Sequence, residues 1–429
     1  MADLVRDTLE NYSAASNLMH NEKIREMMAS GQTIYHFGFG QSPFPIMNKA
    51  ADRLAKHASE SAYLPVAGIE ALRVAIRNFH NKYDSISFSA DDVIVGPGSK
   101  ELIFLLMNIF QGDILVISPS WTSYKPQVML SGHKANVVPT SMEDEWKIRP
   151  EKFTQYLKDN NLSGTKLLIM NNPDNPTGTL YTQKELSDLS EVFKREKVIV
   201  LSDEIYGRLT FDDSFVSMAK VYPEGTILCS GMSKWASMGG WRVGYHVYPE
   251  KLSALKNAVR SAASHTYTTV AAPIQFAVAE VLNDLDTCEA YMRHTCRIMA
   301  AAAQYCHKEL SEVGVSSVKP KGGFYIFPNF EILRAKLKAR GIERCEDMVK
   351  SLFDETSVSV MAGGPAFLRP ETELTIRLCY VNFDGAKALA ASERIGLESS
   401  LPENFVQSQC SQLYDGIQVL KQWAKKTLE

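Results

Sequence analysis

The chain has 429 residues, of which 45% are hydrophobic and 22% are charged, and its formal net charge is −3. These values are typical of a soluble globular protein, and the length is more than one simple core requires, so we expect two domains. The small net charge gives no reason to expect nucleic acid or an anionic membrane as a partner.

The cysteines and the apolar stretches bear on location. Seven cysteines are scattered without CxxC spacing, which indicates reduced thiols in an intracellular protein. No apolar stretch reaches the ~18 residues of a membrane span. The first residues, from Met1 to Asp7, lack the apolar region of a signal peptide and are poor in arginine for a mitochondrial presequence. The sequence therefore predicts a cytoplasmic protein.

The N-terminal part of the chain combines helical segments with a loop. Residues 3–30 are polar and favour a helix, and a stretch rich in helix breakers follows at 37–45. The helical pattern resumes at 46–57, and another helix is expected after Gly68.

From about residue 92, short apolar strands alternate with helices. Strands are predicted at residues 93–95, 114–117, 135–138, 167–170, 198–201, 226–229 and 243–247. Short, wholly apolar strands separated by helices are typical of a mainly parallel sheet that is covered on both faces. The predicted fold class is therefore α/β, with a large domain of this kind.

The pattern changes after a long helical region at 250–313. Strands are predicted at 323–327, 358–360 and 374–378, and a closing helix at 403–427. We expect a smaller α+β domain here, with a boundary near residue 310. The predicted organisation is an N-terminal segment that packs with the small domain, a large domain and a C-terminal small domain, at residues 1–45, 46–310 and 311–429.

The stretch from Ser230 to Tyr245 has the composition of a site for an aldehyde cofactor that carries a phosphate. Lys234 lies in a loop after a predicted strand, directly after Ser233, and Arg242 follows eight residues on. The lysine amine can form a Schiff base with an aldehyde, while the serine and the arginine can hold a phosphate. A lysine after a serine is by itself more often a solvated loop residue, so this interpretation depends on the rest of the chain.

Three polar residues follow the ends of predicted strands, which is where parallel sheets bind ligands. Asp203 comes after the strand at 198–201, where its carboxylate can pair with a protonated pyridine nitrogen or simply cap a helix. Tyr206 and Asn175 can hydrogen-bond to the oxygen of the same ring. An asparagine flanked by prolines is, however, more often a turn residue.

Gly98, Ser99 and Lys100 follow a strand and open a helix, where free backbone N–H groups and a hydroxyl suit a phosphate. A dinucleotide-binding pattern is excluded because Glu101 occupies the third glycine position, and no GKS or GKT sequence follows for a nucleotide P-loop. Trp121 comes just after the next strand, and its indole can stack on a heteroaromatic ring or belong to the core.

Arg377 lies between Ile376 and Leu378 in a predicted strand. A charge in such an apolar setting needs a partner. A carboxylate on a neighbouring strand and the carboxylate of a substrate both satisfy that need, and both alternatives stay open.

Together these motifs resemble a known family. They occur in one order: Tyr63-x-x-x-x-Gly68, Asn175-Pro-Thr-Gly, Asp203-x-x-Tyr206, Ser233-Lys234 with Arg242, Lys-Gly-Gly-Phe-Tyr at 321–325, and Arg377. Over roughly residues 35–390 the chain resembles the class I/II aminotransferases, the fold-type I pyridoxal-phosphate enzymes that include aspartate aminotransferase. The resemblance implies pyridoxal 5′-phosphate (PLP) as cofactor and transfer of an amino group between an α-amino acid and a 2-keto acid. No metal site is expected.

The resemblance also implies roles for the chemical groups. Lys234 carries the cofactor as an aldimine and moves the proton, and Asp203 pairs with the pyridine nitrogen. Tyr206 and Asn175 contact the ring oxygen, and Trp121 stacks on the ring.

The same resemblance implies how the phosphate and the substrate are bound. The residues expected around the phosphate are Gly98, Ser99, Lys100, Ser233 and Arg242. Arg377 takes the substrate α-carboxylate, with Gly40 and Asn175 beside it. Tyr63 reaches the phosphate of the neighbouring subunit, with Thr268 or Thr269 as a looser match, which implies a homodimer with shared active sites.

The substrate side chain is less well indicated. Aspartate-specific members of the best-known subgroup use a second arginine from the partner subunit, but the corresponding stretch at 263–268 has none. The sequence therefore does not predict a dicarboxylate preference. Aromatic and histidine side chains at Phe39, Tyr124, His265 and Tyr267 suggest a pocket for an uncharged side chain, including an aromatic one.

Two alternatives share the scaffold. Other PLP reactions use the same Lys234 and Asp203, so a racemase, a β-lyase or an enzyme like aminocyclopropane-carboxylate synthase stays open. A non-catalytic PLP or amino-acid sensor is a remote alternative, because the chain lacks a basic N-terminal helix-turn-helix module and retains the lysine.

Overall fold

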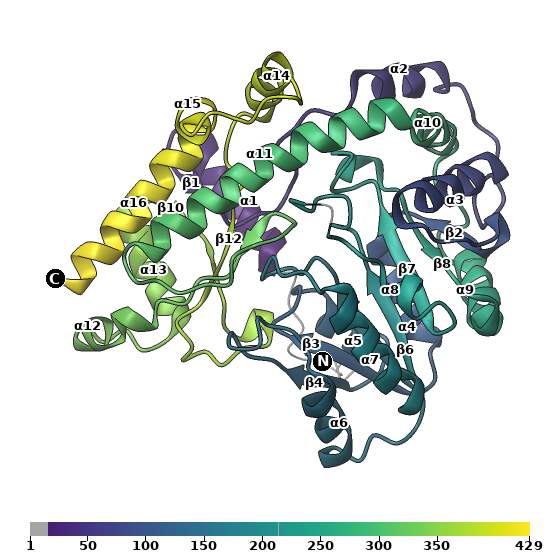
Figure 1. Ribbon diagram of the computed structural model, residues 1–429, viewed down its shortest axis with the longest axis horizontal. Coiled ribbons are helices and arrows are strands. Elements are labelled where there is room, and N and C mark those ends of the chain that lie inside the picture. The colour runs from purple at the N-terminus through teal and green to yellow at the C-terminus, as the bar shows by residue number, and fades with distance from the viewer. Residues whose placement is uncertain (1–15, 213) are drawn as a thin grey trace, which may run out of the picture.

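A seven-stranded sheet organises the larger lobe of the computed structural model, which describes residues 16–212 and 214–429 (Figure 1). Its strand order is β2-β8-β7-β6-β5-β3-β4. Strand β8 runs antiparallel to both neighbours and the other pairs are parallel, so the predicted mainly parallel sheet is confirmed. The strands are β2 (Val93–Gly96), β3 (Asp113–Ser118), β4 (Ala135–Pro139), β5 (Lys166–Asn171), β6 (Val198–Asp203), β7 (Thr226–Gly231) and β8 (Gly244–Val247).

Helices cover both faces of this sheet, which is why the middle of each strand is mostly apolar. Leu167 and Ile169 of β5 pack on one face with Leu102 of α4, whereas Leu168 and Met170 pack on the other face with Leu186 of α7. The helices of this lobe are α2 (Asn48–Lys56), α3 (Glu70–Asp84), α4 (Ser99–Ile109), α5 (Tyr124–Leu130), α6 (Pro150–Asp159), α7 (Gln183–Arg195), α8 (Met218–Val221), α9 (Ser253–His265) and α10 (Ala272–Asn283).

The smaller lobe is built around an antiparallel sheet of order β11-β12-β9. Helix α11 (Leu285–Ser311) runs from the larger lobe into this lobe, as Figure 1 shows. The other elements are β9 (Tyr325–Ile326), α12 (Arg334–Ala339), α13 (Cys345–Thr356), β10 (Val358–Ser359), β11 (Met361–Ala362), β12 (Ile376–Cys379), α14 (Gly385–Ile395), α15 (Phe405–Gln409) and α16 (Ser411–Leu428). Short 3₁₀ turns lie at Ala90–Asp92, Gly239–Trp241, Glu250–Leu252, Glu331–Leu333 and Pro365–Phe367.

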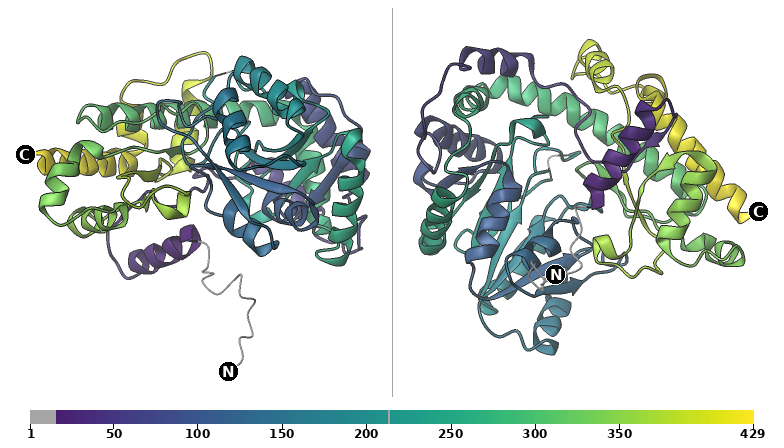
Figure 2. Two further views of the ribbon diagram at one scale, coloured as in Figure 1. Left: turned by 90° about the horizontal axis from the view of Figure 1, so that it is seen from below. Right: turned by 180° about the vertical axis from the view of Figure 1, so that it is seen from behind.

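The N-terminal segment packs on the smaller lobe (Figure 2). Strand β1 (Tyr35–His36) pairs in parallel with β10, and His20 of α1 (Ser16–Ala29) hydrogen-bonds Ser359 across 2.7 Å. The first fifteen residues, which the sequence assigns to this segment, lie outside the described residues. The domain boundaries themselves stay a prediction.

Within the described ranges, no helix combines the length and the apolar character needed to cross a membrane.

Candidate active site

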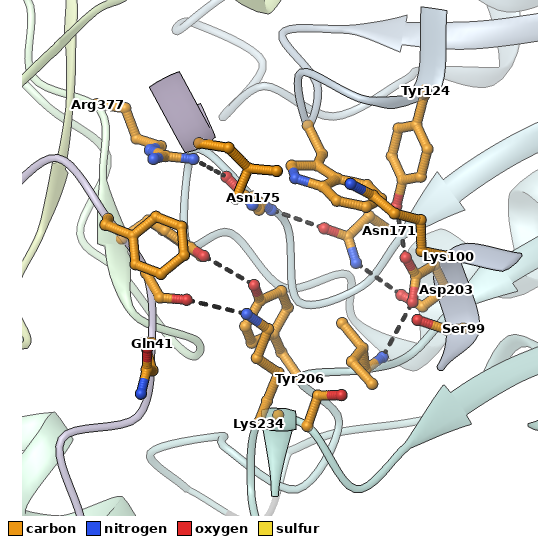
Figure 3. Close-up of a pocket in the computed structure, with 18 of the residues that line it drawn as sticks. Gln41, Ser99, Lys100, Tyr124, Asn171, Asn175, Asp203, Tyr206, Lys234 and Arg377 are labelled. Atoms are coloured by element: carbon orange, nitrogen blue, oxygen red, sulfur yellow. Dashed lines mark hydrogen bonds between the residues drawn. The ribbon is translucent and has the colours of Figure 1, made fainter. Parts of the chain in front are cut away.

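A cavity of about 440 Å³ opens at the carboxyl ends of the parallel strands, where the two lobes meet. All the predicted site residues except Gly98 and Tyr63 line it. In Figure 3, Arg377 lies on one side of the cavity, Ser99, Lys100 and Asp203 lie on the opposite side, and Lys234 lies between them. The fold thus brings together predicted site residues that are up to 337 positions apart, from Gly40 to Arg377.

Lys234 lies in the loop that follows β7. Its Nζ donates a hydrogen bond to the carbonyl of Gly40 across 3.0 Å. Burial, with a smaller contribution from the Arg377 cation, lowers the pKa of Lys234 to about 8. A substantial fraction of this amine is therefore neutral near pH 7–8, which is the form that attacks an aldehyde or accepts a proton.

Asp203 is the last residue of β6 and is buried. Tyr124 donates its hydroxyl to Oδ2 across 2.6 Å, and the N–H of Ile205 donates to Oδ1 across 3.3 Å. Burial raises the pKa of Asp203 to about 6, while the hydrogen bonds and the Lys234 charge act in the opposite direction. No helix starts here, since the next one in the chain is α8, so Asp203 is not the helix cap that the sequence left open. A buried carboxylate of this kind gains most from a cation placed beside it.

The residues predicted around a phosphate form a cationic cradle. Helix α4 begins at Ser99, and Gly98 precedes it with a φ of +89°. Arg242 donates to the carbonyl of Pro97 across 3.2 Å, and a Cβ on Gly98 would lie 2.2 Å from its Nη2. Burial and the charge of Arg242 lower the pKa of Lys100. A helix N-terminus next to two cations is an arrangement that stabilises a phosphate dianion.

The charge balance of the cavity fits the same ligand. Asp203 is the only acidic residue among the described residues that line it, against the cations Lys100, Lys234, Arg242 and Arg377. A phosphorylated aldehyde with a pyridine nitrogen would bring a phosphate anion to the cations of the cavity. Its protonated ring nitrogen would be the cation that Asp203 lacks. The residues present therefore fit PLP.

Arg377 lies in β12 and is 1% exposed. Its Nη2 donates to the carbonyl of Gly38 across 2.7 Å, and its Nη1 donates to Oδ1 of Asn175 across 3.4 Å. Among the described residues it forms no ion pair with a carboxylate, and its Nε has no hydrogen-bond partner. The described residues thus offer Arg377 no structural ion pair, and its buried cation faces the cavity.

The residues predicted near a ring lie in the same cavity. The hydroxyls of Tyr206 and Tyr325 are 2.8 Å apart. The backbone N–H of Asn175 donates to Oδ1 of Asn171 across 2.8 Å, which fixes the loop after β5. The indole of Trp121 packs edge-on against Tyr124, with a centroid distance of 5.2 Å.

Tyr63 is 91% exposed and lies outside the cavity of its own chain. A tyrosine whose hydroxyl contacts the active site of a neighbouring subunit is expected to be exposed when one chain is considered alone. Its role across an interface stays a prediction.

The residues suggested for the substrate side chain need correction. Phe39 lines the cavity, but His265 and Tyr267 do not line it in this chain, and the Tyr267 hydroxyl donates to the carbonyl of Val95. Tyr124 lines the cavity but is engaged with Asp203.

Two other residues of the site were not recognised in the sequence. Asn171 donates its side-chain N–H to the carbonyl of Asp203 across 2.7 Å. Asn171 is the last residue of β5, as Asp203 is of β6, so a polar residue at the end of an apolar strand is the sequence signal that could have identified it. Tyr325 belongs to the Lys-Gly-Gly-Phe-Tyr motif, to which no function was attached.

Comparison with known proteins identifies the family. The family model "Aminotransferase class I and II" matches residues 26–395. The aspartate/prephenate aminotransferase of Cereibacter sphaeroides is 30% identical and covers 88% of this chain and 94% of its own length. The aspartate aminotransferase of Bacillus subtilis is 29% identical over 85% of this chain and 91% of its own. A structure of Thermotoga maritima aspartate aminotransferase, 25% identical, superimposes with a TM-score of 0.78 over 98% of this chain and 100% of that one. The resemblance found in the sequence is thus confirmed, and this chain belongs to the class I and II aminotransferase family and is a PLP-dependent aminotransferase.

Proposed function

We propose that the cavity between the lobes is the site of transamination, with Lys234 as the catalytic amine and Arg377 as the residue that binds every substrate. The observation that carries this proposal is the shared cavity of a buried lysine amine, a buried arginine without a carboxylate partner among the described residues, and a buried aspartate. An α-amino acid and a 2-keto acid both carry the carboxylate that such an arginine requires.

The cofactor would be held at three positions. Its phosphate would lie against the cradle of Gly98, Ser99, Lys100, Ser233 and Arg242. Asp203 would pair with the pyridine nitrogen, Tyr206 and Asn175 would contact the ring oxygen, and Trp121 would pack on the ring. PLP, when bound, supplies an aldehyde that accepts the amino group and a ring that accepts electrons.

Lys234 is placed to move the proton. The pKa of its Nζ, about 8, allows the amine to take a proton from the substrate Cα and to return it near neutral pH. The carbonyl of Gly40 accepts a hydrogen bond from Nζ across 3.0 Å, which fixes the direction from which the amine approaches the substrate Cα. Asp203 stays ionised next to a cationic ring nitrogen, because the opposite charge favours its carboxylate form.

Arg377 is positioned before any substrate arrives. The carbonyl of Gly38 and the amide of Asn175 hold its guanidinium from the side of the protein. The planar fork can then make two parallel hydrogen bonds to a carboxylate. This geometry explains how one residue can serve both donor and acceptor acids.

We propose substrates with an uncharged side chain. In this chain each cation that lines the described cavity already has a task, at the phosphate, at the aldehyde or at the α-carboxylate. Phe39 and Leu18 add apolar surface to the wall. The relatives are named for aspartate and prephenate, so aspartate is the first donor against which an aromatic amino acid should be compared.

Three further assignments follow as proposals. The active unit is a homodimer in which Tyr63 contacts the phosphate held by the neighbouring subunit, and its 91% exposure supports this. The protein works in the cytoplasm, which the scatter of its seven cysteines without CxxC spacing supports. The large domain spans residues 46–310, and the N-terminal segment 1–45 packs with the small domain at 311–429.

The experiment is a panel of amino acids and 2-keto acids given to the purified enzyme with PLP. Transamination should produce a new keto acid and a new amino acid in equal amounts, and Lys234→Ala should produce neither. Racemisation would instead invert the donor without a keto-acid product, and elimination would release ammonia. Either result without paired products would contradict the proposal. A higher kcat/KM for aspartate than for phenylalanine or tyrosine would refute the uncharged preference alone.

A further inference from the structure

Tyr325, the last residue of the Lys-Gly-Gly-Phe-Tyr motif, is buried in the wall of the cavity and has no role so far. It lies in β9, paired with Cys379 of β12, so it belongs to the same small sheet as Arg377. Its ring lies 5.0 Å from Cζ of Arg377. Its hydroxyl lies 2.8 Å from that of Tyr206, which comes from the opposite lobe.

The neighbours of the Tyr325 hydroxyl limit the groups to which it can donate its proton. Among the described residues its hydrogen-bond partner is the Tyr206 hydroxyl. Arg377 is cationic and cannot accept a hydrogen bond, and burial raises the pKa of Tyr325, so its phenol keeps its proton. In the structure either hydroxyl of the pair could donate. Once the Tyr206 proton is directed to the cofactor, as proposed above, the oxygen of Tyr206 is the acceptor left for the buried Tyr325 hydroxyl.

We infer that Tyr325 is a positioning residue for the aminotransferase reaction: its hydroxyl donates to Tyr206 and so directs the Tyr206 proton toward the ring oxygen of the cofactor. The inference rests on the proposed role of Tyr206 at that oxygen. A phenol that accepts one hydrogen bond becomes a better donor in the next, so Tyr325 both orients and strengthens Tyr206.

Gly40 makes room for this arrangement. A Cβ at this position would lie 2.1 Å from the Tyr325 hydroxyl, so glycine allows the phenol to reach Tyr206. The charged and titratable groups that act on or face the two tyrosines are Arg377, Cys379, Asp203 and Lys234, whose Nζ lies 5.6 Å from the centre of the Tyr206 ring. None of them is altered by a change from tyrosine to phenylalanine at 325, which also keeps the ring beside Arg377.

The consequence is measurable in the spectrum of the holoenzyme. Visible absorption reports the proton on the linkage between the cofactor and the lysine, and loss of that proton leaves the negative charge of the ring oxygen uncompensated. A donor at this oxygen therefore stabilises the deprotonated form and lowers the pKa of the linkage. Weakening the donor should raise that pKa.

The test is a pH titration of the visible spectrum for Tyr325→Phe, Tyr206→Phe, the double variant and the wild type, each loaded with PLP. We expect Tyr325→Phe to raise the linkage pKa by roughly half a unit to one unit, in line with one neutral hydrogen bond. Tyr206→Phe should raise it by more, and the double variant should match Tyr206→Phe because Tyr325 acts through Tyr206. Tyr305→Phe, which removes a hydroxyl from α11 outside the cavity, should leave the linkage pKa unchanged.

The outcomes separate this inference from the function on which it rests. A linkage pKa in Tyr325→Phe equal to that of the wild type, with a clear increase in Tyr206→Phe, would overturn the inference alone. Additive increases in the double variant would also overturn it, because Tyr325 would then act independently of Tyr206. If Tyr206→Phe itself left the linkage pKa unchanged, the proposed contact of Tyr206 with the ring oxygen would fail, and the inference with it.

Discussion

At the scale of single residues, Arg377 is the side chain whose setting says most about the substrate. Its guanidinium is 1% exposed and meets a backbone carbonyl, an amide and a thioether instead of a carboxylate. Burying a cation without an anion is unfavourable unless the anion arrives with a ligand.

Arg377→Lys should therefore weaken the binding of donor and acceptor acids alike. Lysine keeps the charge but loses the fork that makes two parallel bonds, so we expect KM to rise about tenfold or more for both, at ~1.4 kcal/mol per decade. The visible spectrum of the bound cofactor should barely change, because Arg377 is not one of its proposed ligands. Steady-state kinetics with both substrates checks this. A variant whose cofactor spectrum changes while both KM values stay the same would show that Arg377 serves the cofactor instead.

Residues could be predicted where a strand end or a sequence motif marked them. Asp203 and Lys234 each follow an apolar strand, and the structure places both in the cavity. The partners of these residues could not be predicted in the same way. Tyr124 reaches Asp203 from 79 positions away, so this contact depends on packing within the larger lobe. Tyr325 reaches Tyr206 from 119 positions away, so that contact depends on how the two lobes meet.

At the scale of elements, the start of α4 shows how backbone geometry shapes the phosphate cradle. Gly98 has a φ of +89°, and the space where its Cβ would project contains the guanidinium of Arg242. Gly132 has a similar φ of +82°, but a Cβ there would meet no heavy atom within 4 Å. Alanine at either position would therefore be strained by the positive φ. Only alanine at position 98 would also clash with a neighbouring side chain.

Gly98→Ala should weaken PLP binding about tenfold or more, because it displaces Arg242 from a charge-assisted contact with the phosphate. Gly132→Ala is the matched control. It should cost a similar stability, about 1 kcal/mol, without changing cofactor affinity. Fluorescence titration of the apoenzyme with PLP measures both affinities. Equal affinities in the two variants would mean that Arg242 is not a phosphate ligand.

The turn after β6 contains a second buried carboxyl group, Glu204. Its Oε1 accepts hydrogen bonds from Ser202, Ser217 and the N–H of Met218, while Oε2 has no partner. Burial raises the pKa of Glu204 from 4.5 to about 8. Because the folded state holds this proton more tightly, its contribution to stability is fully present below pH 4.5 and is lost as the pH rises toward 8.

Glu204→Gln should remove that pH dependence, since the amide keeps the accepting oxygen and cannot ionise. Relative to the wild type, the variant should gain stability between pH 5 and pH 8, by about 1 kcal/mol per pH unit. Urea unfolding of both apoproteins across this range measures the difference. A difference in free energy that does not change with pH would show that Glu204 is ionised in the folded protein.

Periodicity predicted most helices and strands. It did not predict where a long helical region is interrupted or which strand runs antiparallel. Each of the seven strands expected in the larger lobe overlaps an observed strand. The helical region expected at 250–313 is instead three helices, and Asp284 separates α10 from α11 by accepting the N–H of Thr287. The apolar run at 243–247 reads like its parallel neighbours, so nothing local marked β8 as antiparallel.

At the scale of the whole molecule, the proposed homodimer can be tested at Tyr63. Tyr63 is 91% exposed, so in a monomer its hydroxyl would be in water and its removal would change nothing at the cavity. In a dimer with shared sites the same hydroxyl would touch the phosphate of the neighbouring subunit.

Tyr63→Phe should therefore lower the affinity for PLP several-fold, because the variant loses the free energy of one hydrogen bond to a charged group. Light scattering should show a dimer both for the wild type and for the variant, because one hydroxyl does not decide assembly. A fully active monomer at the assay concentration would refute the shared site. A dimeric variant with unchanged PLP affinity would remove Tyr63 from the site and leave the dimer in place.

We propose that Lys234 is the amine to which PLP becomes attached, and borohydride reduction of the holoenzyme tests this attachment. Its Nζ lies buried in the cavity, next to the proposed phosphate and carboxylate sites, with a pKa lowered to about 8. After reduction and proteolysis, mass spectrometry should find the cofactor on the peptide that contains Lys234, and Lys234→Ala should carry no label. A label on another lysine of the wild type, such as Lys100, or no label at all, would show that Lys234 is not the amine that holds PLP.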